Sequence, residues 1–168
     1  MALIRKARLG DLDAVLDLWT ALMQYHRDKH YIFWLEPDQE RPIRVILSQR
    51  IQDPKSSLFV AEIKGELVGL LAASLKEKSI AYQYHKAGYI AETIVLEPFR
   101  NQGIGQELYD YAINWFKASK VDYVELQVAA QNPEARDFWE RKGFEIATAH
   151  LVKPMHSNLT EAKKEPKD

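Results

Sequence analysis

The sequence contains no cysteine. This absence excludes disulfides, thiolate metal ligands and an acyl-enzyme formed on a catalytic thiol. Long hydrophobic runs are missing as well, since no stretch reaches the ~18 apolar residues of a membrane-spanning helix, and the N-terminal residues lack the apolar segment of a secretory signal. We therefore predict a cytoplasmic protein with no membrane partner.

A large excess of charge of one sign is also lacking. The chain has 23 Lys and Arg against 24 Asp and Glu, which gives a formal net charge of -1. No overall positive field exists to gather nucleic acid, so we expect no nucleic-acid partner. A length of 168 residues suits one substantial core and is too short for two ordinary domains. We predict a single domain at residues 1–155, followed by a charged, flexible tail at residues 156–168.

Apolar periodicity predicts a mixture of helices and strands. A glycine-containing turn at Lys64-Gly65 joins two apolar runs into a predicted β-hairpin. The order strand, helix, strand in residues 81–128 implies a parallel crossover. We expect strands at residues 2–8, 58–63, 67–73, 81–96 (with room for an interruption near 85–88), 121–128 and 144–151, and helices at residues 12–23, 43–51, 104–116 and 132–143.

The run Arg100-Asn101-Gln102-Gly103-Ile104-Gly105 lies between a predicted strand and a predicted amphipathic helix. Glycines allow close approach of the backbone, and the unpaired amides of a first helical turn favour an anion such as a diphosphate. A Walker turn would need Gly-Lys-Ser/Thr, and the dinucleotide fingerprint would need a third glycine, so both rivals fail. A Gly-x-Gly pair can also merely shape a turn.

A resemblance to a known family favours the first interpretation. The segment from Val95 to Gly105 resembles the acetyl-CoA motif of the GNAT superfamily, and residues 126–135 and 138–144 resemble its second motif, with Asn-x-x-Ala at the helix start and Gly-Phe at the exit. The resemblance implies an α/β (α+β) fold with a mixed, mostly antiparallel sheet of about six to seven strands and about four helices. The sheet would splay between strands four and five, with the pantetheine arm in that gap.

The resemblance further implies acetyl-CoA as the donor and assigns residues to it. Asn132 would hold the pantetheine arm, although the same side chain suits a helix N-cap. Arg141 would lie near the nucleotide end, although an arginine late in a helix is also favoured by the helix dipole. The remaining assigned residues are Ile94 and Val95 for main-chain contacts with pantetheine, Arg100 beside the phosphates, and Gln102, Gly103, Ile104 and Gly105 for amide contacts with the pyrophosphate.

Glu92 is the candidate general base. It is a lone carboxylate in an apolar run, and an acceptor amine must lose a proton before it attacks a thioester. Two alternatives stay open, because Glu92 would also suit binding of a positively charged acceptor or pairing with a basic side chain. Period-two alternation predicts that Glu92 shares a face with Ile90 and Ile94.

Trp139 stands where many family members carry a tyrosine that protonates the departing thiolate. An indole N–H cannot act as that acid, so we predict packing for Trp139 and no dedicated acid at this position. The acceptor pocket has an aromatic candidate lining, with core packing as the alternative, and the histidines show no metal-ligand spacing, so we assign no metal. The candidate lining residues are Tyr25, His26, Tyr31, Phe33, Trp34, Tyr82, Tyr84 and His85.

The sequence thus predicts an N-acetyltransferase that moves an acetyl group from acetyl-CoA to a primary amine of a small molecule, or to a protein amino group, by direct attack in a ternary complex. The alternative is a non-catalytic acyl-CoA-binding sensor, and a longer acyl donor also stays open. Resemblance to the family adds the expectation of a homodimer.

Overall fold

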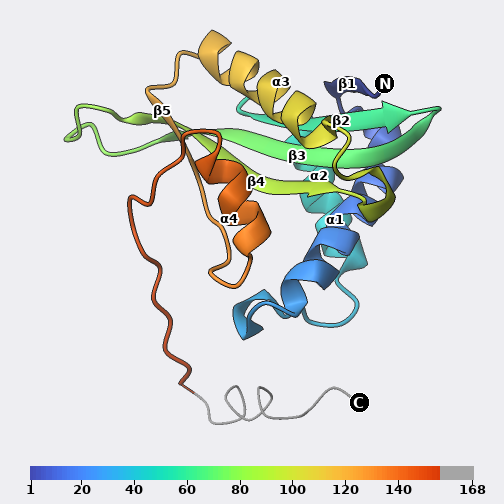
Figure 1. The fold of residues 1–168 in the computed structure, drawn as a ribbon, viewed down its shortest axis with the longest axis horizontal. Coiled ribbons are helices and arrows are strands. Elements are labelled where there is room, and N and C mark those ends of the chain that lie inside the picture. Colours follow the sequence, from blue (N-terminus) through green and yellow to red (C-terminus); the bar gives the residue numbers. More distant parts are fainter. Residues whose placement is uncertain (156–168) are drawn as a thin grey trace.

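The computed structural model describes residues 1–155, so the predicted tail at 156–168 lies outside the described residues. Helices and strands occur in the predicted mixed order (Figure 1). The strands are β1 (Leu3–Lys6), β2 (Ser56–Ile63), β3 (Glu66–Glu77), β4 (Lys86–Val95) and β5 (Tyr123–Leu126); the helices are α1 (Leu12–Arg27), α2 (Glu40–Gln52), α3 (Ile104–Ala118) and α4 (Pro133–Glu140).

The five strands form one sheet in the order β1-β2-β3-β4-β5. The first four pair antiparallel, and β5 pairs parallel to β4 after the crossover through α3. Lys64 and Gly65 connect β2 to β3 with φ of 52° and 85°, the positive values that a tight hairpin turn requires. The mixed, mostly antiparallel sheet of the α/β fold is therefore confirmed.

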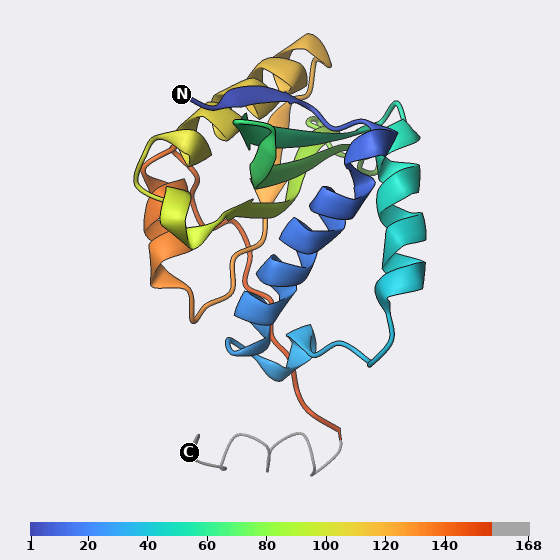
Figure 2. The same cartoon turned by 90° about the vertical axis from the view of Figure 1, so that its right-hand side faces the viewer.

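Two helices cover each face of the sheet (Figure 2). Val15, Leu18 and Leu22 recur at helical spacing on α1 and pack with Leu47 of α2 against one face. The opposite face packs against α3 and α4, whose buried side chains include Leu108, Ala112, Phe116 and Trp139. No helix within residues 1–155 is long and apolar enough to cross a membrane.

The sheet opens between β4 and β5. The two strands pair only from Ala87 with Tyr123 to Ile90 with Leu126, where β5 ends. A bulge accompanies the opening, since Glu92 opposes Ala72 while Ile90 opposes Ala73, and Ala91 is the extra residue. The remainder of β4 therefore has its β5 side free, which is the predicted splay.

The bulge overturns half of the predicted shared face of β4, because Glu92 shares its face with Ile94 but not with Ile90. Ile90 packs in the cluster beneath α3 and α4, whereas Ile94 packs in the cluster beneath α1 and α2. Glu92 points to the α2 side, where it meets Arg50. Strict alternation was wrong here because the extra residue at Ala91 shifts the pattern by one position.

Two predicted strand segments are wrong. Residues 144–151 form no strand, so the described sheet has five strands where about six to seven were expected. These residues lie in an extended segment that leaves α4 (Figure 1), in which Ile146 and Leu151 are 76% and 89% exposed. Alternation shows compatibility with a strand, but a strand also needs a neighbouring edge. Residues 81–85 belong to the connection that precedes β4. At the end of this connection, the carboxylate of Asp122 accepts hydrogen bonds from the amides of His85 and Lys86.

Candidate functional site

A cleft of about 390 Å³ lies where β4 and β5 separate. Its walls come from the end of α1, the free part of β4, the start of α3 and the helix α4. In Figure 1 both α1 and α4 are drawn below β4, although they cover opposite faces of the sheet. The cleft brings together most of the residues predicted to hold acetyl-CoA, namely Ile94, Val95, Arg100, Gly103, Ile104, Gly105 and Asn132, with Trp139 beside them.

The glycine turn has the backbone that an anion site requires. Gly103 precedes α3 with φ of 84°, a conformation that favours glycine, and it offers no side chain to cap the helix. The first helical hydrogen bond here runs from the Glu107 amide to the Gly103 carbonyl. Amides of the first turn thus stay free at the cleft and favour a negatively charged group. This arrangement fits the diphosphate of acetyl-CoA.

Two side chains of this turn donate to backbone carbonyls just before it. The Nε of Arg100 donates to the Val95 carbonyl at 2.9 Å, and the guanidinium lies 5.9 Å from the centre of the Tyr25 ring. Gln102 donates to the Pro98 carbonyl at 3.1 Å and does not line the cleft. Arg100 thus brings positive charge to the end of the cleft at the glycine turn, whereas contacts of Arg100 and of the Gln102 amide with the pyrophosphate stay predictions.

Asn132 lies at the N-terminus of α4 and is 7% exposed. Its Oδ1 accepts the Ala135 amide at 3.3 Å, which is the N-cap that the sequence suggested. The same oxygen accepts the Tyr25 hydroxyl at 3.3 Å, so α1 and α4 meet across the cleft. Arg141 is exposed at the opposite end of α4 and does not line the cleft, and its role near the nucleotide stays a prediction.

Trp139 is 8% exposed and forms part of the core as well as the cleft wall. Its ring centre lies 4.9 Å from that of Phe138, 5.5 Å from Phe144 and 6.1 Å from Tyr109, all in edge-to-face arrangements. Burial raises the pKa of Tyr109. The aromatic cluster therefore gives Trp139 the packing environment expected from its type.

Glu92 is bound to a basic side chain. Both of its carboxylate oxygens accept from Arg50 of α2, at 3.0 Å and 2.8 Å, and the two side chains are only 17% and 22% exposed. This is the pairing alternative, and Glu92 itself does not line the cleft. Sequence reasoning missed Arg50, although its position three residues after the buried Leu47 placed a charge on the apolar face of the predicted helix.

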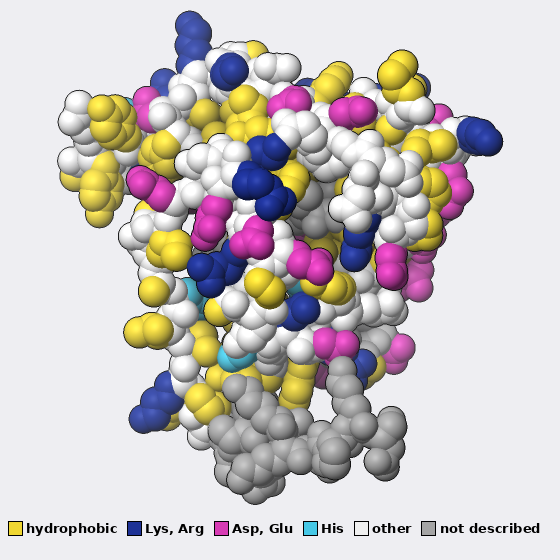
Figure 3. All heavy atoms as spheres, in the orientation of Figure 1, with side chains coloured by type: hydrophobic (Ala, Val, Ile, Leu, Met, Phe, Trp, Pro, Cys, Tyr) yellow, Lys and Arg dark blue, Asp and Glu magenta, His cyan; other side chains and the backbone are white. Residues whose placement is uncertain are grey.

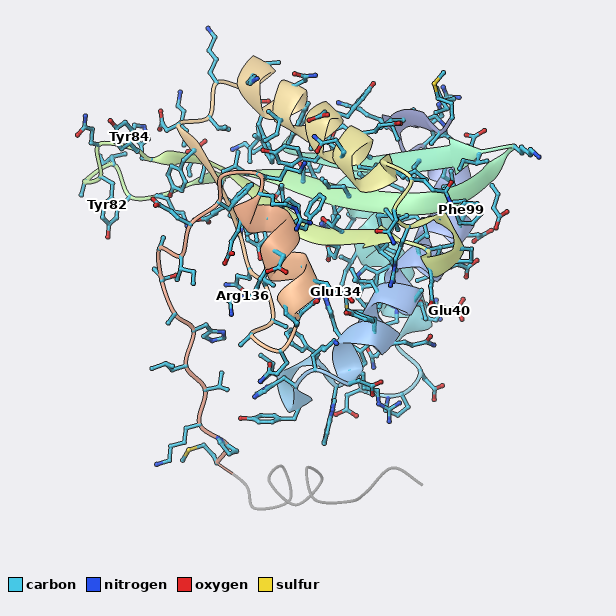
Figure 4. All side chains as sticks on the ribbon, in the orientation of Figure 1. Glu40, Tyr82, Tyr84, Phe99, Glu134 and Arg136 are labelled. Carbon is cyan, nitrogen blue, oxygen red and sulfur yellow. The ribbon has the colours of Figure 1, made fainter. Side chains whose placement is uncertain are left out.

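Some of the aromatic candidates for the acceptor pocket lie at the cleft, and others lie far from it. Tyr25 and His26 line the cleft, and the ring of Phe33 lies 5.2 Å from that of His26. Tyr82 and Tyr84 lie at the tip of the β3–β4 connection, 67% and 61% exposed and away from α4 (Figure 4). Only the α1 end of the predicted lining therefore contributes to the cleft.

Charge on the molecular surface is mixed. On the face shown in Figure 3, Lys and Arg side chains alternate with Asp and Glu side chains. In the part of the chain that the structure describes, no group of three or more His, Asp or Glu is arranged to hold a metal ion.

Comparisons with known proteins agree on one family. The sequence model described as "Acetyltransferase (GNAT) family" matches residues 19–144. An uncharacterized N-acetyltransferase of Archaeoglobus fulgidus is 32% identical over 136 residues, covering 81% of this chain and 88% of the relative.

Solved structures agree on the fold. A tetramutant of the BH1408 protein of Bacillus halodurans has a TM-score of 0.81 at 22% identity, covering 91% of this chain and 99% of that protein. A predicted acetyltransferase of Clostridium acetobutylicum, solved with acetyl-CoA, has a TM-score of 0.75 at 16% identity, covering 92% and 97%.

Proposed function

The chain belongs to the GNAT family of acetyltransferases, and we propose that it transfers the acetyl group of acetyl-CoA to a primary amine of a small molecule. The observation that carries the proposal is the cleft itself. It joins the free amides after Gly103 to the opened edge of β4 and to Asn132 in one continuous groove.

The residues present suit acetyl-CoA along this groove. The amides of Gly103, Ile104 and Gly105 would hold the pyrophosphate with Arg100 beside it, and the free part of β4 would align the pantetheine arm. Acetyl-CoA supplies an acyl group activated as a thioester, whose thiol leaves with modest help. The chain has no cysteine, which is consistent with direct attack by the amine in a ternary complex.

The acceptor would enter beside the end of α1, where Tyr25 and His26 line the cleft. Arg50 already neutralises Glu92, so the carboxylate no longer favours a cationic acceptor over a neutral one. A small-molecule amine is therefore proposed without a preference for extra positive charge, and a protein amino group is tested beside it.

The test uses the absence of cysteine, because a thiol-reactive dye then reports only the CoA that is released. Purified protein is incubated with acetyl-CoA and with tyramine, spermidine, glycine or a short peptide with a free amino terminus. The proposal expects amine-dependent thiol release and a matching acetylated product by mass spectrometry. CoA binding by calorimetry with no thiol release from any amine would indicate a binding module instead.

A variant pair tests the glycine turn. Gly105→Asp places a negative charge in the first turn of α3, where it suits the helix dipole but repels a diphosphate. Gly105→Ala adds only a carbon, at an ordinary 3.7 Å from the Phe138 ring. We expect the aspartate variant to keep its fold and to lose far more affinity for CoA than the alanine variant; equal affinities would refute this placement of the pyrophosphate.

A further inference from the structure

The α1 end of the cleft contains an ionisable side chain to which the assignments above give a place in the lining but no chemical role. His26 lies one helical turn after the buried Leu22, so both side chains face the sheet. Both line the cleft together with Ala91 and Thr93 of the opened part of β4. The imidazole therefore lines the same cleft as the bulged part of β4.

Glu92 is poorly arranged to take up a proton at this place. Each of its oxygens already accepts a guanidinium N–H of Arg50. Protonation would break one of these charge-assisted bonds and leave the arginine, 22% exposed, without its full partner. The proton of an attacking amine therefore needs another acceptor.

His26 has the protonation state that such an acceptor requires. Its burial lowers its pKa from the usual 6.5, the nearby Glu92 carboxylate partly opposes this shift, and Lys29 adds to it. The charges that act on the ring are those of Glu92, which is bound to Arg50 of α2, and of Lys29 after the end of α1. The ring of Tyr25 lies 6.1 Å from that of His26. The imidazole is thus mostly unprotonated at neutral pH and free to accept a proton.

We infer that His26 is the general base of the acetyl transfer. The inference rests on the proposed function and names the residue that activates the acceptor. As the neutral amine nitrogen bonds to the acetyl carbon, its proton passes to an imidazole nitrogen. The carbon–sulfur bond breaks, and its electron pair leaves on sulfur. The thiolate takes a proton from solvent, and the imidazolium returns its proton to solvent, so that the protein is restored.

The experiment compares wild type with His26→Gln and with the control His150→Gln, an exposed histidine after α4. Steady-state kinetics are measured from pH 5 to 9 with whichever tested amine gives thiol release. We expect kcat to fall about 100-fold or more in His26→Gln, the usual scale for a general base, and to be unchanged in the control. Calorimetry should give wild-type affinity of His26→Gln for acetyl-CoA.

Two readouts separate chemistry from structure. The wild-type kcat/KM, calculated with the concentration of unprotonated amine, should decline at acid pH with a midpoint below 6.5. The nuclear magnetic resonance titration of the His26 ring should have the same midpoint. The resonance is assigned by its loss in His26→Gln. Added imidazole should restore part of the rate of His26→Ala, because a small base then fills the vacated space.

The outcomes are distinct for the inference and for the function. Turnover by wild type that persists in His26→Gln with an unchanged pH profile would overturn the inference and leave acetyl transfer intact. Disagreement between the kinetic and ring midpoints of the wild type would overturn it, even if the substitution lowered turnover for a structural reason. Wild-type protein that binds acetyl-CoA and acetylates no amine would overturn both.

Discussion

Removing Arg50 should destabilise the protein far more than removing Arg50 and Glu92 together. The two side chains share two hydrogen bonds of 3.0 Å and 2.8 Å and retain exposed fractions of 22% and 17%. A hydrogen bond to a charged group contributes about 1.5 to 3 kcal/mol, but the remaining exposure to water weakens it. We therefore expect Arg50→Met alone, or Glu92→Met alone, to lower the free energy of unfolding by about 2 kcal/mol, since each leaves a mostly buried charge without its partner.

The double variant replaces both charges by apolar side chains in a site next to the core, so its cost should be about 1 kcal/mol or less. The coupling energy of the double-mutant cycle would then be about 3 kcal/mol. The assay is urea unfolding of the four proteins at pH 7.5, supported by thermal unfolding, in which each single variant should shift the midpoint by roughly 4–8 °C.

Additive effects would refute this reasoning. If both single variants cost less than about 0.5 kcal/mol, the pair would behave as an ordinary surface ion pair. Glu92 would then again be a candidate general base, because its carboxylate could leave Arg50 and accept a proton. Kinetics of Glu92→Gln complete the comparison. If His26 is the base, turnover should persist and the acid limb of the pH profile should move to lower pH, because the Glu92 carboxylate no longer raises the pKa of His26.

Three further variants test other parts of the structure. Gly88→Ala should lower the free energy of unfolding in urea by about 1–3 kcal/mol, because the added carbon would lie 2.6 Å from the Phe116 ring. Gly105→Ala, which meets only ordinary contacts, is the control, and equal stabilities of the two variants would contradict the packing at Gly88. The hydrogen-bonded ion pair with Arg5 lowers the pKa of Asp11 below its usual 3.8. The pair therefore stabilises the fold above pH 3.8, and this stabilisation is lost as the pH falls through the lowered pKa of Asp11 in the folded protein. Asp11→Asn should therefore be less stable than wild type at pH 7 and nearly equal at pH 2; a constant difference would argue against linkage. Trp139→Tyr should lower the melting temperature without raising kcat, and a large rise in kcat would instead show that the site lacks an acid.

The sequence predicted best those features that neighbouring residues determine. The glycine turn needs positive φ at Gly103, the cap of α4 needs the side chain of Asn132, and the hairpin needs Gly65. In each case the conformation follows from residues within a few positions, so local chemistry is sufficient.

Features that depend on distant contacts were not predicted. Arg50 and Glu92 lie 42 positions apart, and only the folded sheet brings α2 to β4. The bulge at Ala91 has no local glycine or proline to mark it and becomes visible only through pairing with β3. Residues 144–151 had the alternation of a strand but no paired edge in the structure. Hydrophobic pattern alone carries no information on which partner is within reach.

This division explains why the donor is identified from the sequence and the acceptor is not. The donor side of the cleft is built from two continuous segments, the turn before α3 and the start of α4, whose residues carry a recognisable order. The proposed acceptor side combines the end of α1 with the bulged part of β4, and each contributes one or two side chains, such as His26 and Ala91. A pocket assembled in this way can exchange single residues and accept another amine while the donor segments and the fold persist. Acceptor identity should therefore follow substitutions at these scattered positions more closely than it follows overall similarity to other members of the family.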